Sequence, residues 1–291
     1  TFEALELLIG KVHAAGGMVH LWMWGDETRG WTPHRWRLNG GVDRRLQRYL
    51  AARLGPLPGW TMGYGFDLDE WVVRRDLEVW HRHLQEQFGW SHLLGARDAG
   101  PNRGLDHRRN QIYEGLGYAG YEHHRPAFAV YRAAASARPD RPAFSEDRFR
   151  IRHSREYAEK DYTMELTRRG LWHSTMAGGV ANIWGHFPSR RDTWQGSARY
   201  EKPQMIKTYS RFFAGRFRNQ MRPAAQGMCL QVPAGTHYVF YAEDTESVML
   251  DLTAMAGVQP AVAVDTLRPY QELPLGRLKA AETNWRAPYR S

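Results

Sequence analysis

The chain has 291 residues, of which 42% are hydrophobic, so it is long enough to bury a substantial core. Its formal net charge is +9, and 35 of its 40 basic residues are arginines. These arginines are scattered along the chain without a basic tail or a nucleic-acid-binding motif, so the composition argues against a nucleic-acid partner.

Hydrophobic periodicity divides most of the chain into alternating helices and strands. Apolar residues at helical spacing predict helices at residues 2–15, 43–54, 69–88, 126–138, 154–176 and 199–217. Short apolar runs predict strands at residues 18–24, 59–65, 91–98, 118–124, 141–147 and 179–186. Such alternation over about 200 residues is typical of a parallel sheet with crossover helices.

The pattern changes after Met221-Arg222-Pro223. Short strands separated by turns are expected at residues 228–232, 237–242, 247–252, 261–265 and 276–281. Because they alternate only partly between apolar and polar residues, they predict a small antiparallel β-sandwich with one face of each sheet on a core. We therefore expect two domains, at residues 1–220 and 221–291.

Six parallel strands are fewer than the eight that a closed barrel of this type needs. The chain opens on a helix, which suggests that a strand-helix-strand portion precedes Thr1. The lack of a final strand after Tyr289 suggests that further chain follows there as well.

Acidic residues follow two of the predicted strands. Asp67 and Asp69 come after strand 59–65, and Glu146 ends the apolar run that begins at Arg141. If both strands belong to one parallel barrel, these acids face the same mouth, and a facing pair of carboxyl groups is the machinery of glycoside hydrolysis. The alternative is structural, since Asp67 and Asp69 can also cap the following helix.

Several segments resemble one family. Residues 48–63 resemble the approach to the fourth barrel strand in clan A glycoside hydrolases, closest to the apiosidase-like group. Residues 142–146 resemble the nucleophile strand, and residues 236–286 the β domain that often follows the barrel. The resemblance implies a (β/α)8 TIM-type barrel with its N-terminal strands missing here, followed by a small antiparallel β-sandwich.

The resemblance also assigns roles. It implies that Glu146 is the nucleophile and that the acid/base lies at the end of strand 59–65. Many clan A enzymes carry Asn-Glu at that point, whereas this chain has Phe66-Asp67-Leu68-Asp69-Glu70. The apiosidase-like group uses an Asp there, which favours Asp67, with Asp69 as the second candidate.

Further candidates for substrate binding lie at strand ends. Aromatic rings stack on the apolar faces of sugars, and polar side chains hold the hydroxyl groups or keep the nucleophile ionised. The predicted substrate-binding residues are Trp24, Asp26, Glu27, Arg97, Tyr121, His123 and Trp184.

No cofactor is expected. Cys229 is the only cysteine, and neighbouring strand residues such as His123 and His124 point to opposite faces, which disfavours a metal site. No apolar run is long enough to span a membrane. The expected partner is a carbohydrate substrate, and the location, secreted or cytoplasmic, stays open.

The sequence therefore predicts a retaining glycoside hydrolase that acts on a poly- or oligosaccharide. Two alternatives remain at this stage. One is a non-catalytic carbohydrate-binding or assembly protein on the same barrel, and the other is a metal-dependent hydrolase, because a fold alone does not fix a function.

Overall fold

A computed structural model gives the architecture of the protein. It describes residues 1–24, 36–65, 68, 72–96, 116–121, 123, 125–137, 139–146, 163–181, 202–215, 219–225 and 227–286. The chain forms two compact units: unit 1 comprises residues 1–123 and 133–147, and unit 2 comprises residues 124–132 and 148–291. The predicted domain boundary near residue 220 stays a prediction.

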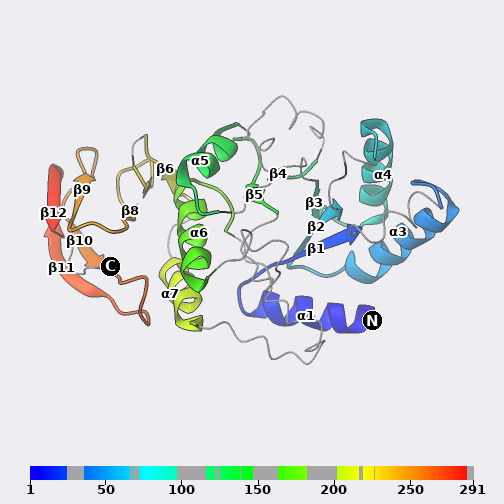
Figure 1. Ribbon diagram of the computed structural model, residues 1–291, viewed down its shortest axis with the longest axis horizontal. Coiled ribbons are helices and arrows are strands. Elements are labelled where there is room, and N and C mark those ends of the chain that lie inside the picture. Colours follow the sequence, from blue (N-terminus) through cyan, green and yellow to red (C-terminus); the bar gives the residue numbers. More distant parts are fainter. Residues whose placement is uncertain are drawn as a thin grey trace. The chain divides into compact units, whose positions relative to one another are not determined.

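Unit 1 contains the predicted parallel strands. They are β1 (Val19–Trp24), β2 (Trp60–Gly65), β3 (Leu93–Gly95), β4 (Ala119–Tyr121) and β5 (Ala143–Ser145). β1, β2 and β3 pair in parallel in that order, and β4 pairs in parallel with β5 (Figure 1). Among the described residues, β3 and β4 do not pair as a ladder, and the Gly117 N–H just before β4 donates to the Leu94 carbonyl at 2.8 Å.

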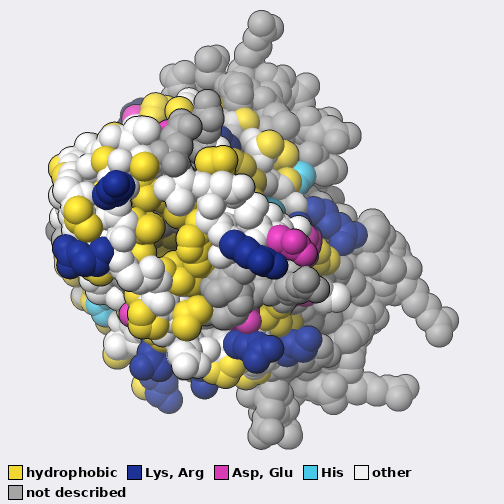
Figure 2. All heavy atoms as spheres, turned by 90° about the vertical axis from the view of Figure 1, so that its left-hand side faces the viewer, with side chains coloured by type: hydrophobic (Ala, Val, Ile, Leu, Met, Phe, Trp, Pro, Cys, Tyr) yellow, Lys and Arg dark blue, Asp and Glu magenta, His cyan; other side chains and the backbone are white. Residues whose placement is uncertain are grey.

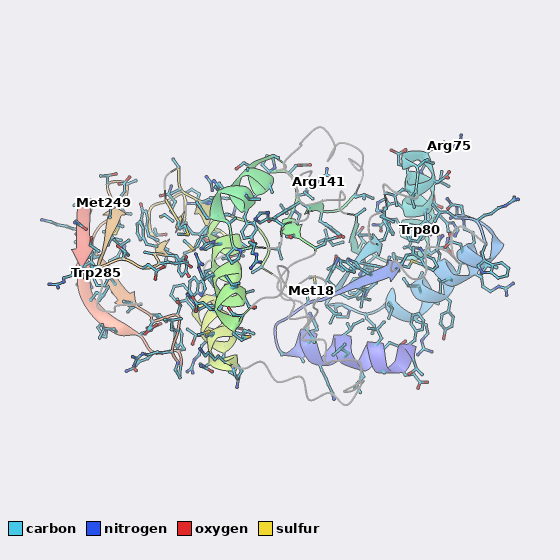
Figure 3. All side chains as sticks on the ribbon, viewed as in Figure 1. Met18, Arg75, Trp80, Arg141, Met249 and Trp285 are labelled. Atoms are coloured by element: carbon cyan, nitrogen blue, oxygen red, sulfur yellow. The ribbon has the colours of Figure 1, made fainter. Side chains whose placement is uncertain are left out.

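The helices of the first half of the chain are amphipathic. Their bounds are α1 (Phe2–Ala14), α3 (Gly41–Leu54), α4 (Arg74–Gln87) and α5 (Phe128–Ala137). α3 buries Leu50 and Leu54, and α4 buries Trp80, whose ring lies 4.2 Å from that of Tyr64 on β2 (Figure 3). Burial of the apolar faces of α3 and α4 stabilises unit 1, whereas Phe128 at the start of α5 packs against a core of unit 2.

Unit 2 combines two helices with short antiparallel strands. The helices are α6 (Met164–Met176) and α7 (Pro203–Phe213). The strands are β6 (Arg222–Pro223), β7 (Cys229–Gln231), β8 (Tyr238–Phe240), β9 (Ser247–Asp251), β10 (Gln259–Ala263), β11 (Leu273–Leu278) and β12 (Glu282–Arg286). Among the described residues they form three small sheets, in the orders β6-β7-β8, β10-β11 and β12-β9.

One hydrophobic core of unit 2 joins helices to strands. Trp172 of α6 and Phe213 of α7 pack with Leu230 and Val239 of β7 and β8. The ring of Trp172 stacks on that of Tyr241 at 5.0 Å between centroids and 5° between planes. Because this core draws on both sides of residue 220, the helices and the strands of unit 2 stabilise one another.

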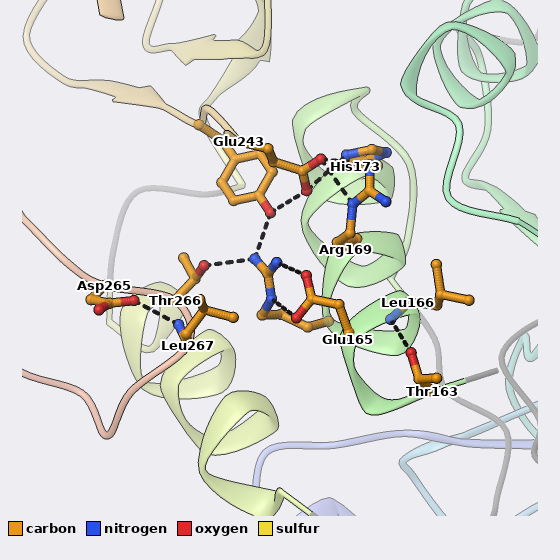
Figure 4. Close-up of polar contacts among 11 residues, drawn as sticks. Thr163, Glu165, Leu166, Arg169, His173, Glu243, Asp265, Thr266 and Leu267 are labelled. Atoms are coloured by element: carbon orange, nitrogen blue, oxygen red, sulfur yellow. Dashed lines mark hydrogen bonds and ion pairs between the residues drawn. The ribbon is translucent and has the colours of Figure 1, made fainter. Parts of the chain in front are cut away.

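A buried polar network also ties α6 to the strands of unit 2 (Figure 4). The Arg168 guanidinium donates to the hydroxyls of Tyr241 at 2.8 Å and Thr266 at 2.7 Å. The Tyr241 hydroxyl in turn donates to Glu243 at 2.6 Å, and Arg169 donates to the same carboxylate at 2.9 Å. Linked donors and acceptors of this kind satisfy charges that burial alone would destabilise.

The sixth predicted strand, at 179–186, is wrong where the structure describes it. Residues 177–179 form the turn that ends α6, residues 180 and 181 are in neither a helix nor a strand, and residues 182–186 lie outside the described part. Gly178 has φ +86°, and the Gly179 N–H donates to the Ser174 carbonyl at 2.9 Å. These are features of a glycine helix cap, so the N–H of Gly179, the first residue of the predicted strand, is bonded to α6.

Some other helices and strands begin or end at residues that differ from the predicted ones. Residues 72 and 73 precede α4, which begins at Arg74 and not at 69. β6 and β12 were not predicted, because β6 has only two residues and β12 carries little apolar alternation. Among the described residues, no helix has the length and apolarity needed to cross a membrane.

Glu243 gives the polar network a pH dependence. Burial by itself raises the pKa of this carboxyl, but hydrogen bonds from His173, Arg169 and Tyr241 outweigh it and lower the pKa to about 2. A carboxyl with a depressed folded-state pKa contributes stability above its ordinary value of 4.5, and that contribution is lost as the pH falls toward 2.

We predict that Glu243→Gln lowers the free energy of unfolding at pH 7 by on the order of 2 kcal/mol, and by clearly less near pH 3. Urea unfolding at both pH values measures the difference. Glu246→Gln, a change of an exposed carboxyl on the same turn, is the matched control and should shift stability little at either pH. An equal loss at both pH values for Glu243→Gln would contradict the role given to its charge.

Candidate active site

Glu146 directly follows β5 and is held by the sheet. Its backbone N–H donates to the Tyr121 carbonyl at 3.0 Å, which extends the β4–β5 pairing by one step. Its side chain is fully buried, at 0% exposure. A carboxylate removed from water in this way needs hydrogen-bond donors or positive charge beside it.

The hydroxyl of Tyr118 is one such donor. It donates to Oε1 of Glu146, and the Tyr118 side chain is itself 2% exposed. Two glycines on the neighbouring strands make room for its ring. A Cβ at Gly95 would lie 2.4 Å from the ring, and a Cβ at Gly63 would lie 3.1 Å from the hydroxyl. The small residues on β2 and β3 therefore let Tyr118 reach the carboxylate.

His20 approaches the same carboxylate from β1. Its Nε2 lies 3.6 Å from Oε1 of Glu146, and its ring packs edge-on against Tyr118 at 5.8 Å. Five strands side by side in a flat sheet would separate the first from the fifth by roughly 19 Å, at about 4.8 Å per step. The contact between β1 and the end of β5 therefore means that these strands curve around a shared interior.

The face of β1 that carries His20 also carries Trp22 and Trp24, since alternate residues of a strand share a face. The Trp22 ring lies 6.3 Å from that of His20. Trp24 is the last residue of β1 and is 6% exposed. Its buried indole N–H has no acceptor among the described residues, so it is available to an oxygen atom of a bound molecule.

Four of the predicted site residues fall in the described part. Glu146, Trp24, Tyr121 and His123 all lie at or just after the carboxyl ends of parallel strands. The backbone N–H of His123 donates to Ser145 Oγ at 2.9 Å, which links the ends of β4 and β5. The other predicted residues lie outside the described part: Asp26, Glu27, Asp67, Asp69, Arg97 and Trp184.

His20 and Tyr118 are not among the site residues predicted from the sequence. His20 lies on the same face of β1 as Trp22 and Trp24, so the alternation of residues along this strand could have indicated it. Tyr118 comes directly before β4. Because side chains alternate along a strand, Tyr118 and Gly120 share one face and Tyr121 lies on the opposite face. The Tyr118 hydroxyl donates to Glu146.

The arrangement holds an acidic side chain between a hydroxyl donor and an imidazole. A hydrogen bond from a hydroxyl holds a carboxyl group in a fixed orientation, which suits a nucleophile. Among the residues that the structure describes, no group of three or more His, Cys, Asp or Glu side chains is placed to hold a metal ion.

Solved structures with a similar fold are glycoside hydrolases. One, described as a glycoside hydrolase, matches with a TM-score of 0.61 at 13% identity, over 84% of this chain and 65% of its own. A glycoside hydrolase family 5 structure from Bacteroides vulgatus ATCC 8482 matches with a TM-score of 0.56 at 12% identity, over 84% of this chain and 62% of its own. A third chain, from the same bacterium, has a TM-score of 0.52 at 13% identity and covers 94% of this chain and 52% of its own.

Comparison of the amino-acid sequence with known families and proteins gives no match. No protein-family model matches the chain. No curated protein matches it either. The chain spans between about half and two thirds of the length of the solved structures. The predicted glycoside hydrolase resemblance is therefore confirmed at the level of a mixed α/β fold, while clan A, the apiosidase-like group, the closed barrel and the β-sandwich stay predictions.

We predict that Gly95→Ala displaces the Tyr118 ring and lowers the free energy of unfolding by about 1–3 kcal/mol, because the added methyl group overpacks a filled interior. Urea unfolding measures the loss. Gly89→Ala is the matched control, since a Cβ at Gly89 meets nothing within 4 Å. If both variants unfold at the same urea concentration, the close approach of Tyr118 to β3 is wrong.

Proposed function

We propose that the protein is a retaining glycoside hydrolase that cleaves a glycosidic bond in a poly- or oligosaccharide. The observation that carries the proposal is Glu146, a carboxylate at the carboxyl end of a parallel strand with Tyr118 and His20 against it. The likeness of the fold to glycoside hydrolases supports it. In this proposal the curved strands of unit 1 belong to a (β/α)8 barrel whose mouth holds the site.

The reaction takes two displacements. In the first, an oxygen of the Glu146 carboxylate bonds to the anomeric carbon while the bond to the glycosidic oxygen breaks, and Asp67 gives that oxygen its proton. In the second, the Asp67 carboxylate takes a proton from water, whose oxygen bonds to the anomeric carbon and releases Glu146. Retention requires the two carboxyl groups to lie about 5–5.5 Å apart. Asp69 is the alternative acid/base.

Tyr118 and His20 act as positioning residues in this scheme. The Tyr118 hydroxyl fixes one carboxylate oxygen, and the His20 imidazole lies near the same atom. Donors held in place before the substrate binds need no reorganisation during the reaction. Trp24 contributes an apolar ring and an indole N–H at the end of β1 for the sugar. Asp26, Glu27, Arg97, Tyr121, His123 and Trp184 complete the proposed substrate-binding set.

One observation favours a second candidate function. Glu146 has no exposed surface, whereas a nucleophile must be reached by its substrate. A carboxylate enclosed by a tyrosine and a histidine also serves as an internal structural contact. The alternative is therefore a non-catalytic carbohydrate-binding or assembly protein that kept the fold and uses Glu146 to hold its strands together.

Replacing Glu146 separates the two functions. We predict that Glu146→Gln abolishes hydrolysis of an aryl glycoside and the glycosyl-enzyme intermediate, a loss of at least about 10³-fold in kcat, because the amide cannot act as the nucleophile. A screen of arrayed glycans and aryl glycosides first identifies the substrate. Glu86→Gln, a change of an exposed carboxyl on α4, is the control for charge removal and should keep full activity.

Unfolding measurements on the same variants complete this test. A large loss of activity with little loss of stability supports catalysis. A wild-type protein that hydrolyses none of the glycans, together with a strongly destabilised Glu146→Gln variant, supports the structural role instead. Unchanged activity in Glu146→Gln contradicts the proposed nucleophile.

Azide distinguishes the acid/base from the nucleophile. We predict that Asp67→Asn still forms the intermediate with substrates that have good leaving groups and then stalls, because water lacks its general base. Azide needs no base, so it should restore turnover and give a glycosyl azide of retained configuration. Asp69→Asn is the matched variant. Azide rescue in Asp69→Asn alone would move the role to Asp69, and rescue in neither variant would contradict the acid/base assignment.

A further inference from the structure

The strands of unit 2 enclose an apolar hollow that the proposed reaction does not use. Its volume is about 360 Å³, and its lining includes Val248, Leu250, Leu278 and Trp285. Figure 2 shows it as an opening lined by hydrophobic side chains. A cavity of roughly 150 Å³ with such a lining holds one benzene ring, so this hollow has room for two or three apolar side chains.

Two strands turn their edges to the hollow. Residues 236–242, which contain β8, line it without a break, and so do residues 259–266, which contain β10. When consecutive residues of a strand border a cavity, the edge of the strand faces it, because one face would contribute only alternate residues. β8 ends its sheet, with β7 as its neighbour, and β10 has β11 as its neighbour in the described part of the fold.

Strand edges are templates for pairing, and two-stranded sheets are marginally stable alone. Pro260 on β10 fits an edge position, since proline has no N–H for a ladder. If a strand were added at these edges, the side chains on one of its faces would enter the hollow. On β9, Val248 lines the hollow, whereas its neighbour Met249 is 62% exposed and lies on the other face (Figure 3).

The lining also contains two buried donors without a partner. The indole N–H of Trp172, on a side chain that is 2% exposed, has no acceptor in the described structure, and neither does the Tyr238 hydroxyl. Because buried donors are costly when unpaired, they indicate an occupant that brings oxygen acceptors with its apolar groups. Backbone carbonyls of an extended peptide meet that requirement.

Charge indicates which peptide fits. Residues 227–286 contain four basic and seven acidic residues, a formal charge of −3, although the whole chain carries +9. Asp244, Glu246 and Asp251 in this part are exposed. A segment with basic flanks is therefore attracted to these strands, and one with acidic flanks is repelled.

We propose that unit 2 binds an extended peptide segment by strand addition at the edges of β8 and β10. The segment alternates apolar and polar residues, so that its apolar face fills the hollow, and it is flanked by basic residues. Its backbone pairs with the strand edges, and its side chains give specificity. This site is independent of glycoside hydrolysis.

Synthetic peptides test the proposal on the intact chain. The probe is Lys-Lys-Val-Thr-Val-Thr-Val-Lys-Lys with a fluorescent label, and anisotropy measures its binding. One matched control has the same composition with its three valines consecutive, and another replaces the lysines by glutamates. We expect both controls to bind at least about tenfold more weakly, because the first loses the alternation and the second the charge complementarity.

Hydrogen exchange distinguishes strand pairing from simple filling of an apolar hollow. With the alternating peptide bound, the amides of residues 238–240 and of Gln259, Ala261 and Val262 should exchange at least about tenfold more slowly. Binding without this protection overturns the proposal, because it would show an apolar pocket without backbone pairing. Equal binding of all three peptides, or binding of none, overturns it as well.

Substitutions at the hollow test whether the peptide binds there. Ala261→Trp fills the lined side of β10 and should weaken binding at least about tenfold, and Val262→Phe does the same at a position that is 40% exposed and tolerates a larger ring. Met249→Trp adds an indole to the other face of β9 and should leave binding unchanged. Circular dichroism confirms that each variant is folded, and undiminished binding by folded Ala261→Trp or Val262→Phe contradicts the site.

Discussion

The contact of Tyr118 and His20 with Glu146 is the interaction on which unit 1 is organised. A buried carboxyl group needs hydrogen-bond donors beside it, and here the Tyr118 hydroxyl donates to Glu146 while His20 Nε2 of β1 lies 3.6 Å from the same oxygen. These residues meet only because the strands curve and because Gly63 and Gly95 leave room for the Tyr118 ring. The same contact serves catalysis or structure, depending on whether a sugar reaches the carboxylate.

Unit 2 contains two different buried regions, a polar network and an apolar hollow. On the α6 side, buried polar groups are linked by hydrogen bonds, with Arg168 donating to Tyr241, and Arg169 and Tyr241 donating to Glu243. On the far side of Tyr241, the strands enclose an apolar space whose donors lack acceptors in the described structure. A satisfied polar network fixes its surroundings, whereas an apolar hollow bounded by strand edges is suited to binding.

The likeness to solved structures concerns the fold, whereas the site residues concern the function. Likeness at 12–13% identity establishes a fold of the glycoside hydrolase type, and many functions can share one fold. The residues at the strand ends carry the functional argument, and among them Glu146 has described side-chain neighbours in Tyr118 and His20. Replacement of Glu146 therefore tests the proposed function most directly.

The sequence by itself determined the order of helices and strands up to β5 and the placement of Glu146 at a strand end, because apolar periodicity and strand termini are local properties. Only the tertiary structure identified Tyr118 and His20 as partners of Glu146, since 28 and 126 residues separate them from it along the chain. It also showed that the expected strand at 179–186 starts in a helix cap, where the Gly179 N–H donates to the Ser174 carbonyl. Local pattern predicts elements, whereas contacts across a curved sheet depend on register and on space left by small residues.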